Sequence, residues 1–404
     1  MFQVGAREHY AVARAFHELG VLDWLVTDFW LPPGRLASAA PLSMRGRWHE
    51  ALREARVKSF NRQCLLFESR ARLTDQKGWV QMMDRNRWFQ TSAVKWLEKQ
   101  LPLSDQTPPI IASYSYAASR LFFAGKRLGC RTIMFQIDPG PAEEDILLGI
   151  ERKHPQLIKM RVVAPREYWS DWKLQCELAD IIVVNSEWSR RCLMDADVEA
   201  SKIRILPLAY ETEAHKVAAE RKEYPQEFTP ARPLRVLFLG QVNLRKGMGE
   251  IFQTLRSLHS APLEIWFAGP EQLTVPEEFR RDPRIKWLGM VPRMRVDEFY
   301  RNADVFLFPT HSDGFGLTQL EAQDWRLPII ASRFCGSVVR HGVNGLVISE
   351  VSEREITRAL QWCLAHPAEL AEMSRNSYVA EEFRPNALKS SIRKLLGELA
   401  SPPQ

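Results

Sequence analysis

Short apolar segments alternate with helical segments along most of this chain, and no other feature restricts its fold as strongly. The apolar segments have the length and the β-branched and aromatic composition of strands. Helical stretches separate them, among them 117–128 and 186–194, the second with Ser186 as its N-cap. Because parallel strands require long crossover connections, this alternation predicts an α/β protein with helices on both faces of parallel sheets. The expected strands are 109–112, 131–137, 181–184, 234–239, 263–268, 305–308 and 329–331.

The alternation stops between Glu211 and Pro233 and then begins again. This stretch is charged and also contains Pro225 and Pro230, which is typical of a linker or an irregular insert. A chain of 404 residues has the length of two domains of ordinary size. We therefore expect two doubly wound domains joined near residue 210.

Residues 41–100 fit this pattern least. Trp48, Leu52 and Ala55 have helical spacing, which predicts a basic helical insert in the first domain. Residues 1–100 hold more Lys and Arg than Asp and Glu, and this excess equals the net charge of +6 of the whole chain. A basic surface attracts nucleic acid, anionic lipid or a phosphorylated substrate, although a solvated helical face explains any single residue equally well.

Composition and cysteine spacing exclude several classes of protein. With 45% hydrophobic and 26% charged residues, the chain is typical of a soluble globular protein. No apolar run has the ~18 residues that would span a bilayer, and the first residues lack the order of a signal peptide. The six cysteines form no C-x-x-C pair and the histidines no H-E-x-x-H, so we expect neither a zinc site nor a disulfide framework. A reducing, cytoplasmic location is expected.

The stretch Thr310–Trp325 joins an apolar strand to a helix through a loop that contains Gly314 and Gly316. In a parallel α/β sheet, ligands bind outside the carboxyl ends of the strands. Glycine lets the backbone approach a ligand, and a helix N-terminus favours phosphate. Carboxylates suit sugar hydroxyls, because an ionised acid accepts two hydrogen bonds at once. Since Asp313 and Glu321 flank this corner, the pattern indicates a nucleotide-sugar site.

A second corner, Leu239–Gly247, also follows an apolar strand and precedes a helix. It carries two adjacent cations, Arg245 and Lys246. A lysine there can neutralise the charge that grows on a departing diphosphate. Taken singly, Asp313 would be interpreted as an N-cap and Glu321 as a solvated helix residue. The joint occurrence of the two corners favours the nucleotide-sugar site over these interpretations.

These corners resemble those of the retaining glycosyltransferases of family 4 (glycosyltransferase group 1 type), which carry G-R-L-x-x-x-K-G and E-G-F-G-x-x-x-L-E. The corresponding segments here are 240–247 and 313–321. The stretches GVNGLVI (342–348) and ADIIVVNSEWSRRCL (179–193) match in kind and order. The resemblance is specific over most of residues 179–383 and weak over 1–178.

The resemblance implies the GT-B fold, in which two Rossmann-like domains face each other across a cleft. Residues 1–206 would form the acceptor-binding domain, with the basic helical insert at about 41–100 and a C-terminal helix, 384–404, that completes it. Residues 207–383 would form the nucleotide-sugar-binding domain.

The resemblance also implies roles for single residues. Asp313 and Lys246 would be catalytic, Asp313 at the donor sugar and Lys246 at the diphosphate, and Glu321 would hold the ribose hydroxyls. No metal ion and no further cofactor are implied. The expected donor-binding residues are Gly5, Arg7, Gly240, Gln241, Arg245, Gly314, Phe315, Gly316, Leu317 and Glu321.

Several positions depart from the family pattern. Asp313 replaces a glutamate, and Gln241 stands where the family has an arginine, so Arg245 or Arg7 would have to supply the second cation. The helix tail 324–326 is bulkier than usual. The family often has a histidine of the first domain near the donor sugar, whereas the loop Gln136–Gly140 offers Asp138.

The function that the resemblance implies is transfer of a sugar, with retained configuration, from a UDP- or GDP-sugar to a glycan or lipid-linked acceptor in bacterial cell-surface polysaccharide synthesis. The alternative is a catalytically weakened nucleotide-sugar-binding partner of a polysaccharide assembly complex. An epimerase or phosphorylase on the same fold lacks motif support. Asp195-Ala196-Asp197 has the D-x-D form of metal-dependent transferases, but its place after a helix favours a surface turn.

No nucleic-acid partner is expected, but the basic first hundred residues suit a peripheral contact with an anionic membrane. Four tryptophans lie among these residues, although core packing explains them more simply than membrane contact does. The tryptophans are Trp48, Trp79, Trp88 and Trp96, and the cations expected to make the contact are Arg45, Arg47, Arg53 and Arg56.

Overall fold

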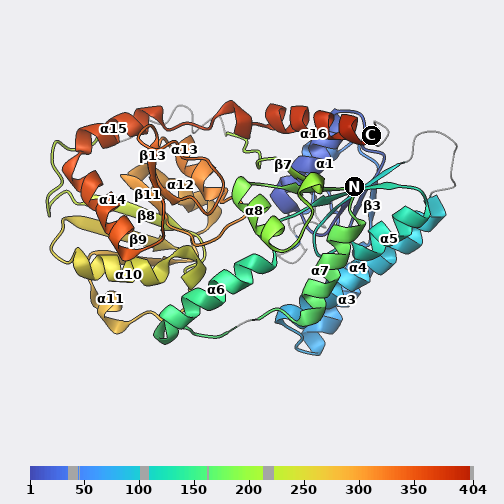
Figure 1. Cartoon of the computed structure of the whole chain (residues 1–404), viewed down its shortest axis with the longest axis horizontal. Helices are drawn as coiled ribbons and strands as arrows, with labels where there is room; N and C mark the ends of the chain where they lie inside the picture. The colour runs from blue at the N-terminus through green and yellow to red at the C-terminus, as the bar shows by residue number, and fades with distance from the viewer. Residues whose placement is uncertain (35–43, 45, 101–108, 162, 213–222, 401–404) are drawn as a thin grey trace.

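The computed structural model describes residues 1–34, 44, 46–100, 109–161, 163–212 and 223–400, which form two parallel β-sheets with helices on both faces (Figure 1). Within these ranges the first sheet has seven strands in the order β3-β2-β1-β4-β5-β6-β7. Every pair in it is parallel. Its strands are β1 (Phe2–Gln3), β2 (Leu25–Thr27), β3 (Val57–Ser59), β4 (Ile110–Tyr114), β5 (Arg131–Phe135), β6 (Ile181–Val184) and β7 (Ile203–Ile205).

The second sheet is also parallel and, in the described ranges, has the order β10-β9-β8-β11-β12-β13. Both sheets therefore begin in the middle, run to one edge and return to the other side, which is the doubly wound, Rossmann-like topology. The predicted α/β class and the two Rossmann-like domains are confirmed. The strands are β8 (Leu234–Leu239), β9 (Leu263–Ala268), β10 (Ile285–Gly289), β11 (Val305–Phe308), β12 (Ile329–Ser332) and β13 (Gly345–Ile348).

The helices connect these strands and cover both faces of each sheet (Figure 1). None of the described helices has the length and apolar composition needed to cross a membrane. In the first half of the chain they are α1 (Ala11–Glu18), α3 (Asn61–Leu73), α4 (Gly78–Gln100), α5 (Ser119–Arg127), α6 (Pro141–Lys153), α7 (Arg166–Leu178) and α8 (Glu187–Asp195). In the second half they are α10 (Met248–Ser257), α11 (Glu277–Arg281), α12 (Arg293–Asn302), α13 (Thr318–Asp324), α14 (Glu353–Ala365), α15 (Pro367–Asn376) and α16 (Pro385–Ala400).

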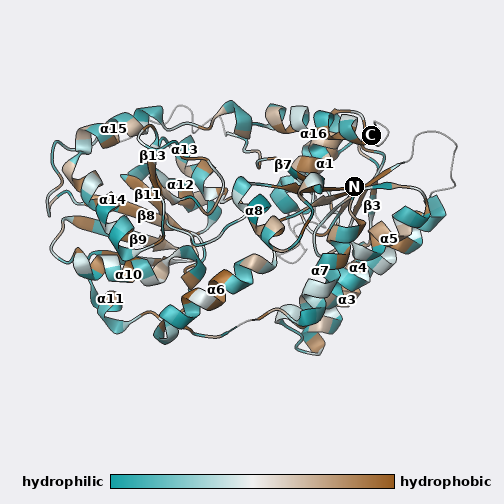
Figure 2. Ribbon diagram, viewed as in Figure 1, coloured by the Kyte–Doolittle hydropathy of each residue, from teal (hydrophilic) through white to brown (hydrophobic). Residues whose placement is uncertain are grey.

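The apolar runs of the central strands are explained by burial on both faces. In β6, Ile181 and Val183 face one core of the first domain, and Ile182 and Val184 face the other. Side chains alternate along a strand, so a strand with cores on both sides needs an apolar residue at each position. Figure 2 shows the hydrophobic strands enclosed by helices with hydrophilic outer faces in both domains.

Two helices pack far from their neighbours in sequence. The C-terminal helix α16 lies against α1 and contributes Leu388 and Ile392 to a core of the first domain. Helix α6 instead lies against the second domain, where Ile150 joins the core, and Ile158 just beyond it forms an antiparallel bridge with Leu273. The chain therefore passes between the domains several times, and the boundary proposed at residues 206/207 stays a prediction.

The stretch predicted as a helical insert is only partly helical. Helices α3 and α4 form an antiparallel pair in which Phe67 stacks on Trp88. Before them, the predicted helix is reduced to a short 3-10 turn, Glu50–Leu52, which excludes Trp48 and Ala55, and Val57–Ser59 adds an edge strand beside β2. A strand of three residues is too short to leave an alternating pattern in the sequence.

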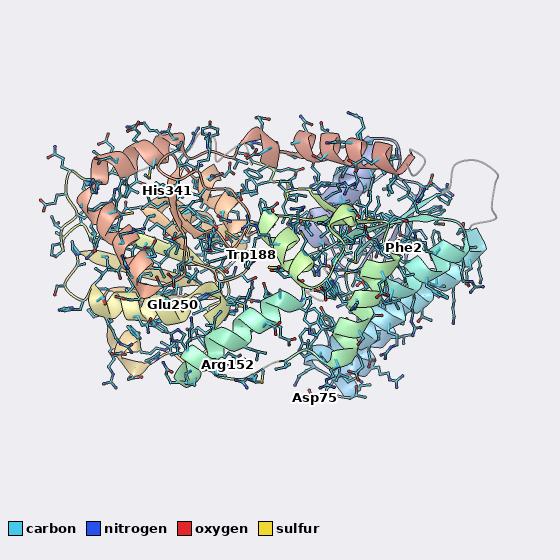
Figure 3. All side chains as sticks on the ribbon, viewed as in Figure 1. Phe2, Asp75, Arg152, Trp188, Glu250 and His341 are labelled. Atoms are coloured by element: carbon cyan, nitrogen blue, oxygen red, sulfur yellow. The ribbon has the colours of Figure 1, made fainter. Side chains whose placement is uncertain are left out.

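Glu250 of α10 attaches α6 to the second domain. Its two carboxylate oxygens lie 3.3 Å from Nε2 of His154, which follows α6, and 3.1 Å from Nε2 of His311. Burial alone would raise the pKa of Glu250, but the contacts with the two histidines lower it to about 2. Figure 3 labels Glu250 at α10, close to α6.

We expect the Glu250→Gln variant to have a lower melting temperature than the wild type at neutral pH. Because the pKa of Glu250 is depressed in the folded state, its charge stabilises the fold above the unfolded pKa of about 4.5. That stabilisation, on the order of 3 kcal/mol, is lost as the pH falls towards about 2. Melting curves of both proteins should therefore converge over this interval, and a constant difference would contradict the assignment.

Candidate functional site

The second sheet has its topological switch point between β8 and β11, where strand order reverses. The loops that follow these two strands, 240–247 and 309–317, therefore meet outside the carboxyl ends, where α/β sheets bind ligands. The N–H of His311 donates a hydrogen bond of 2.8 Å to the carbonyl of Arg245, which joins the loops. Gly247 has a φ of +79°, and a Cβ there would lie 2.2 Å from the Pro309 carbonyl oxygen, so only glycine permits this approach.

The structure brings both predicted catalytic residues together at this point. The Lys246 ammonium donates a hydrogen bond to Oδ2 of Asp313 and lies 4.4 Å from the centre of the Phe308 ring. The guanidinium of Arg245 is 3.6 Å from the same Asp313 oxygen. Burial alone would raise the pKa of Asp313, but the charges of Lys246 and Arg245 outweigh it and hold the pKa below its usual value. Two cations and one carboxylate thus form a compact site with excess positive charge.

Lys246 is nearly enclosed, with 9% of the residue exposed. Burial lowers its pKa, and the neighbouring Asp313 carboxylate opposes that shift. In such low-dielectric surroundings a second anion that reaches the ammonium competes with the carboxylate for it. An anion that enters the site would therefore compete with Asp313 for Lys246 and leave the carboxylate free to accept other hydrogen bonds.

Two residues of the first domain reach this site and were missed by sequence reasoning. Glu143, at the start of α6, accepts a hydrogen bond of 2.9 Å from the Ser312 hydroxyl and lies 3.5 Å from the Arg245 guanidinium. Trp188 of α8 donates a hydrogen bond of 3.1 Å from Nε1 to the same hydroxyl. Figure 3 shows Trp188 between the two domains. The only sequence signal of Glu143 is its position after the carboxyl end of β5. Trp188 follows β6 and lies within the stretch 179–193 that resembles the family, but no role was predicted for it.

The pKa of the Glu143 carboxyl group is higher than that of an ordinary glutamate. Burial raises its pKa to about 7, although the charge of Arg245 opposes the shift. Near neutral pH this group is therefore divided between its charged and uncharged forms, beside the cations of the second domain.

Glu321 lines a cavity of about 290 Å³ between the domains. The hydroxyl of the buried Tyr300 donates a hydrogen bond of 2.8 Å to Oε2 of Glu321, which fixes the orientation of the carboxylate. Leu317 and Arg293 also line the cavity on this side, and His9 faces them from the first domain, 3.0 Å from Arg293. The cavity combines an oriented carboxylate with apolar and cationic walls.

The other expected donor-binding residues differ in how they are placed. Gly314 lies opposite the first domain, since a Cβ there would be 2.8 Å from the Ile137 carbonyl oxygen. The Phe315 side chain is buried in a core with Phe383, so only its backbone belongs to the corner. Gln241 is exposed, and its amide oxygen accepts a hydrogen bond of 3.4 Å from Asn243. Gly240 and Gly316 complete the two loops, and the helix after the second loop begins at Thr318.

The first sheet has its own switch point, between β1 and β4, and a cavity of about 400 Å³ lies there. Arg7 and Asp138 line it. The Asp138 carboxylate accepts hydrogen bonds from the Tyr116 hydroxyl at 2.5 Å and from Nε2 of Gln136 at 2.9 Å. Burial raises the pKa of Asp138 despite these hydrogen bonds. Gly5 lies beside this cavity, where its N–H donates to the Asp28 carboxylate.

The described residues contain no group of three or more His, Cys, Asp or Glu side chains placed to hold a metal ion. Asp195 and Asp197 are exposed at the end of α8. They precede β7, so they lie towards the amino end of the parallel strands, and the two switch points are at the carboxyl ends. The surface-turn interpretation of this D-x-D stretch therefore agrees with its position.

Residues 233–366 match the protein family described as "Glycosyl transferases group 1". An uncharacterized 41.2 kDa protein in the cps region of Klebsiella pneumoniae is 19% identical to this chain over 221 residues, which are 54% of this chain and 62% of that protein. A D-inositol 3-phosphate glycosyltransferase of Acidothermus cellulolyticus is 29% identical over 189 residues, 42% of each chain. The chain thus spans 62% and 42% of the lengths of these relatives.

Among solved structures, Alr3699/HepE of Anabaena in complex with UDP has a TM-score of 0.62 and 12% identity, covering 98% of this chain and 99% of that chain. A further structure of that protein holds UDP-glucose, with a TM-score of 0.59, 13% identity and coverage of 98% and 99%. At such identities the similarity establishes the fold. The fold is GT-B, as the resemblance implied, and residues 233–366 form a glycosyl transferase group 1 domain.

Proposed function

We propose that this chain is a retaining glycosyltransferase that moves a sugar from a nucleoside-diphosphate sugar to a glycan or lipid-linked acceptor in bacterial cell-surface polysaccharide synthesis. The observation that carries the proposal is the meeting of Lys246, Arg245 and Asp313 at the switch point of the second sheet. The same domain contributes Glu321 to the interdomain cavity, and Glu143 of the first domain lies 3.5 Å from Arg245. The UDP and UDP-glucose in the Anabaena structures support a nucleotide-sugar donor, with UDP or GDP as the nucleotide.

In this proposal the diphosphate binds Lys246 and Arg245 and displaces Asp313 from them. Asp313 then accepts hydrogen bonds from the donor sugar, and Glu321 accepts them from the ribose hydroxyls. The buried position of Lys246 strengthens its interaction with the charge that develops as the diphosphate departs. Of the remaining expected residues, Gly5 and Arg7 lie at the first-domain cavity, and their assignment to the diphosphate stays a prediction.

In this proposal the configuration is retained because the acceptor attacks on the face from which the diphosphate leaves. An acceptor hydroxyl forms the new bond to the anomeric carbon as the bond from that carbon to the diphosphate oxygen breaks. The hydroxyl proton passes to the departing diphosphate, so charge and atoms balance. The protein orients both reactants and stabilises the leaving group.

The cavity at the first switch point is the proposed acceptor site. Helix α4 forms one wall, and there the buried atoms Nε1 of Trp79 and Nε of Arg85 have no hydrogen-bond partner in the described part of the chain. Both atoms are donors, so they suit oxygen atoms of an acceptor. Asp138 and Arg7 contribute charged groups to the lining.

A nucleotide-sugar-binding partner of a polysaccharide assembly complex, catalytically weakened, remains the second candidate. Gln241 favours it, because this exposed amide stands where the family carries a cation. The two candidates are distinguished by incubating the chain with nucleotide sugars and following release of nucleoside diphosphate, which a binding protein would not produce.

Glu143 should make donor binding depend on pH. Its pKa is raised to about 7, so its negative charge beside Arg245 is lost as the pH falls through neutrality. We expect the KM for the donor to fall by about three- to tenfold between pH ~8 and pH ~6, because a protonated Glu143 no longer repels the diphosphate.

The Glu143→Gln variant should show the low KM at both pH values. Glu187→Gln provides the matched control, since Glu187 is an acid at the start of α8 that pairs with Arg190. A pH dependence that survives in the Glu143 variant would show that another group causes it.

Activity should persist in excess EDTA, because in this proposal Lys246 and Arg245 neutralise the diphosphate. The comparison is diphosphate release before and after chelation, with Mg²⁺ or Mn²⁺ added back. Loss of activity that is restored by either ion would show that a metal ion takes part in the reaction and would contradict this prediction.

A further inference from the structure

We propose that the outer surface of the α3–α4 hairpin docks on an anionic lipid bilayer and holds the first-domain cavity at the membrane. The docking surface consists of Leu65, Leu66, Leu73, Val80 and Met82 together with Arg62, Arg70 and Arg72. In Figure 3, Asp75 marks the free end of this hairpin, which projects from the first domain.

Large apolar side chains on this surface are open to solvent. Leu66 is 71% exposed and Leu73 is 88% exposed, and Val80, at the start of α4, is 57% exposed. In α3 the buried residues Cys64 and Ala71 are seven positions apart and therefore share the inner face. Leu66 and Leu73 have the same spacing and share the outer face, so the exposure follows from the helix register. Figure 2 shows hydrophobic and hydrophilic residues side by side at this end of the hairpin.

The cations of the same helix are exposed and lack acidic partners. Arg62, Arg70 and Arg72 form no ion pair with any described residue, whereas Lys77 pairs with Asp75 and Arg87 pairs with Asp84. Cations interleaved with leucines are typical of helices that lie in the interface of an anionic bilayer. A protein partner would favour an apolar centre with few charges, which this surface lacks.

Helix α4 carries residues of both the docking surface and the wall of the proposed acceptor site. Met82, 36% exposed, belongs to the surface and also lines the first-domain cavity, one turn from Arg85 and beside Trp79. Tyr168 of α7 contacts Trp79 with ring centres 4.6 Å apart, and the segment before α7 exposes Met160. A bilayer against the hairpin would therefore lie close to this cavity.

The surface differs from the one that the sequence indicated. Arg47 is not a surface cation, because it donates hydrogen bonds to the buried Asp28 carboxylate at 2.8 and 2.9 Å. Arg56 lies over the Trp24 ring at 4.1 Å, Arg53 is 3.6 Å from Glu50, and Arg45 falls outside the described residues. Trp79, Trp88 and Trp96 pack against the core of the first domain. Burial thus withdraws Arg47 and these three tryptophans from the expected contact, whereas Arg53 and Arg56 stay exposed beside Glu50 and Trp24. Within the described residues 46–73, the exposed cations without an acidic or aromatic partner are those of α3.

The test is co-sedimentation of the full chain with vesicles of phosphatidylcholine alone or of phosphatidylcholine and phosphatidylglycerol in equal amounts. We expect binding to the anionic vesicles only, weakening steeply from low to physiological salt. The variant Arg62→Glu/Arg70→Glu/Arg72→Glu should lower binding by about 100-fold, since each cation contributes about fivefold. Leu66→Glu/Leu73→Glu should also abolish it.

The matched control is Arg256→Glu/Arg281→Glu/Arg295→Glu, which changes the net charge equally in the second domain. These arginines pair with Glu278, Glu277 and Glu298. The control should retain binding. Equal recovery with neutral and anionic vesicles, or loss of binding in the control to the same extent as in the hairpin variant, would overturn the proposal.

The docking proposal rests on the proposed function for the identity of the cavity, but separate measurements test the two. Donor hydrolysis without vesicles should be unchanged in both hairpin variants, because none of their residues belongs to the donor site. Vesicle binding without any hydrolysis would leave the docking surface standing and count against the transferase.

Discussion

Lys246→Ala should lower turnover of the donor by about 10²-fold or more, in the range observed for single groups that stabilise developing charge. The reason is the position of the ammonium, which is nearly enclosed and bonded to Asp313 at the switch point. The fall should appear in kcat as well as in kcat/KM, because the interaction strengthens as the diphosphate departs. Initial rates over a range of donor concentrations provide the measurement.

Two further variants separate charge from packing. Lys246→Met retains an aliphatic chain over Phe308 but removes the charge, so it should be as inactive as the alanine variant. Lys286→Ala removes an exposed lysine that pairs with Glu264 at 2.7 Å, and its turnover should equal that of the wild type. Near wild-type turnover in a folded Lys246→Met protein would remove Lys246 from the mechanism.

Glu321→Gln should raise the KM for the donor by about 10- to 100-fold with little change in kcat. Loss of charge-assisted hydrogen bonds to the ribose costs roughly 1.5–3 kcal/mol. Tyr300 can still donate to the amide oxygen of the variant, so the buried hydroxyl keeps a partner and the fold should be retained.

A donor lacking both ribose hydroxyls makes this test specific. The wild type should bind this donor as weakly as the variant binds the normal donor. The affinity of the variant should fall little further when the hydroxyls are removed. If removal of the hydroxyls weakens donor binding equally in both proteins, Glu321 does not hold the ribose.

Much of the fold is visible in the sequence because both sheets are buried on both faces. The apolar runs 181–184 and 305–308 coincide with β6 and β11. The Ser186 hydroxyl accepts a hydrogen bond of 3.1 Å from the Ser189 N–H, as expected of an N-cap. Strands β1 and β3 escape detection, since two or three residues carry no period.

The second-domain part of the site could be predicted from the sequence for a similar reason. Each corner lies directly after a recognisable strand, and the doubly wound order places both corners at one switch point. Lys246 and Asp313, 67 positions apart, therefore meet without any long-range information beyond topology.

The contribution of the first domain to the site could not be predicted from the sequence. Glu143 reaches Ser312 because α6 crosses to the other domain, and its sequence carries no sign of that crossing. Arg47 appeared to be a surface cation until the structure paired it with Asp28. Both errors concern contacts between segments far apart in the chain, which local pattern and composition do not encode.

The most direct test of the proposed function is an assay of nucleoside-diphosphate release from a panel of UDP- and GDP-sugars, in the presence of EDTA. The account predicts slow hydrolysis of at least one donor by the wild type and about 10²-fold less by Lys246→Ala. Supply of the accepting glycan or lipid should then give a product with the anomeric configuration of the donor, read by NMR. Binding of a nucleotide sugar with no release, or a product of inverted configuration, would contradict the account.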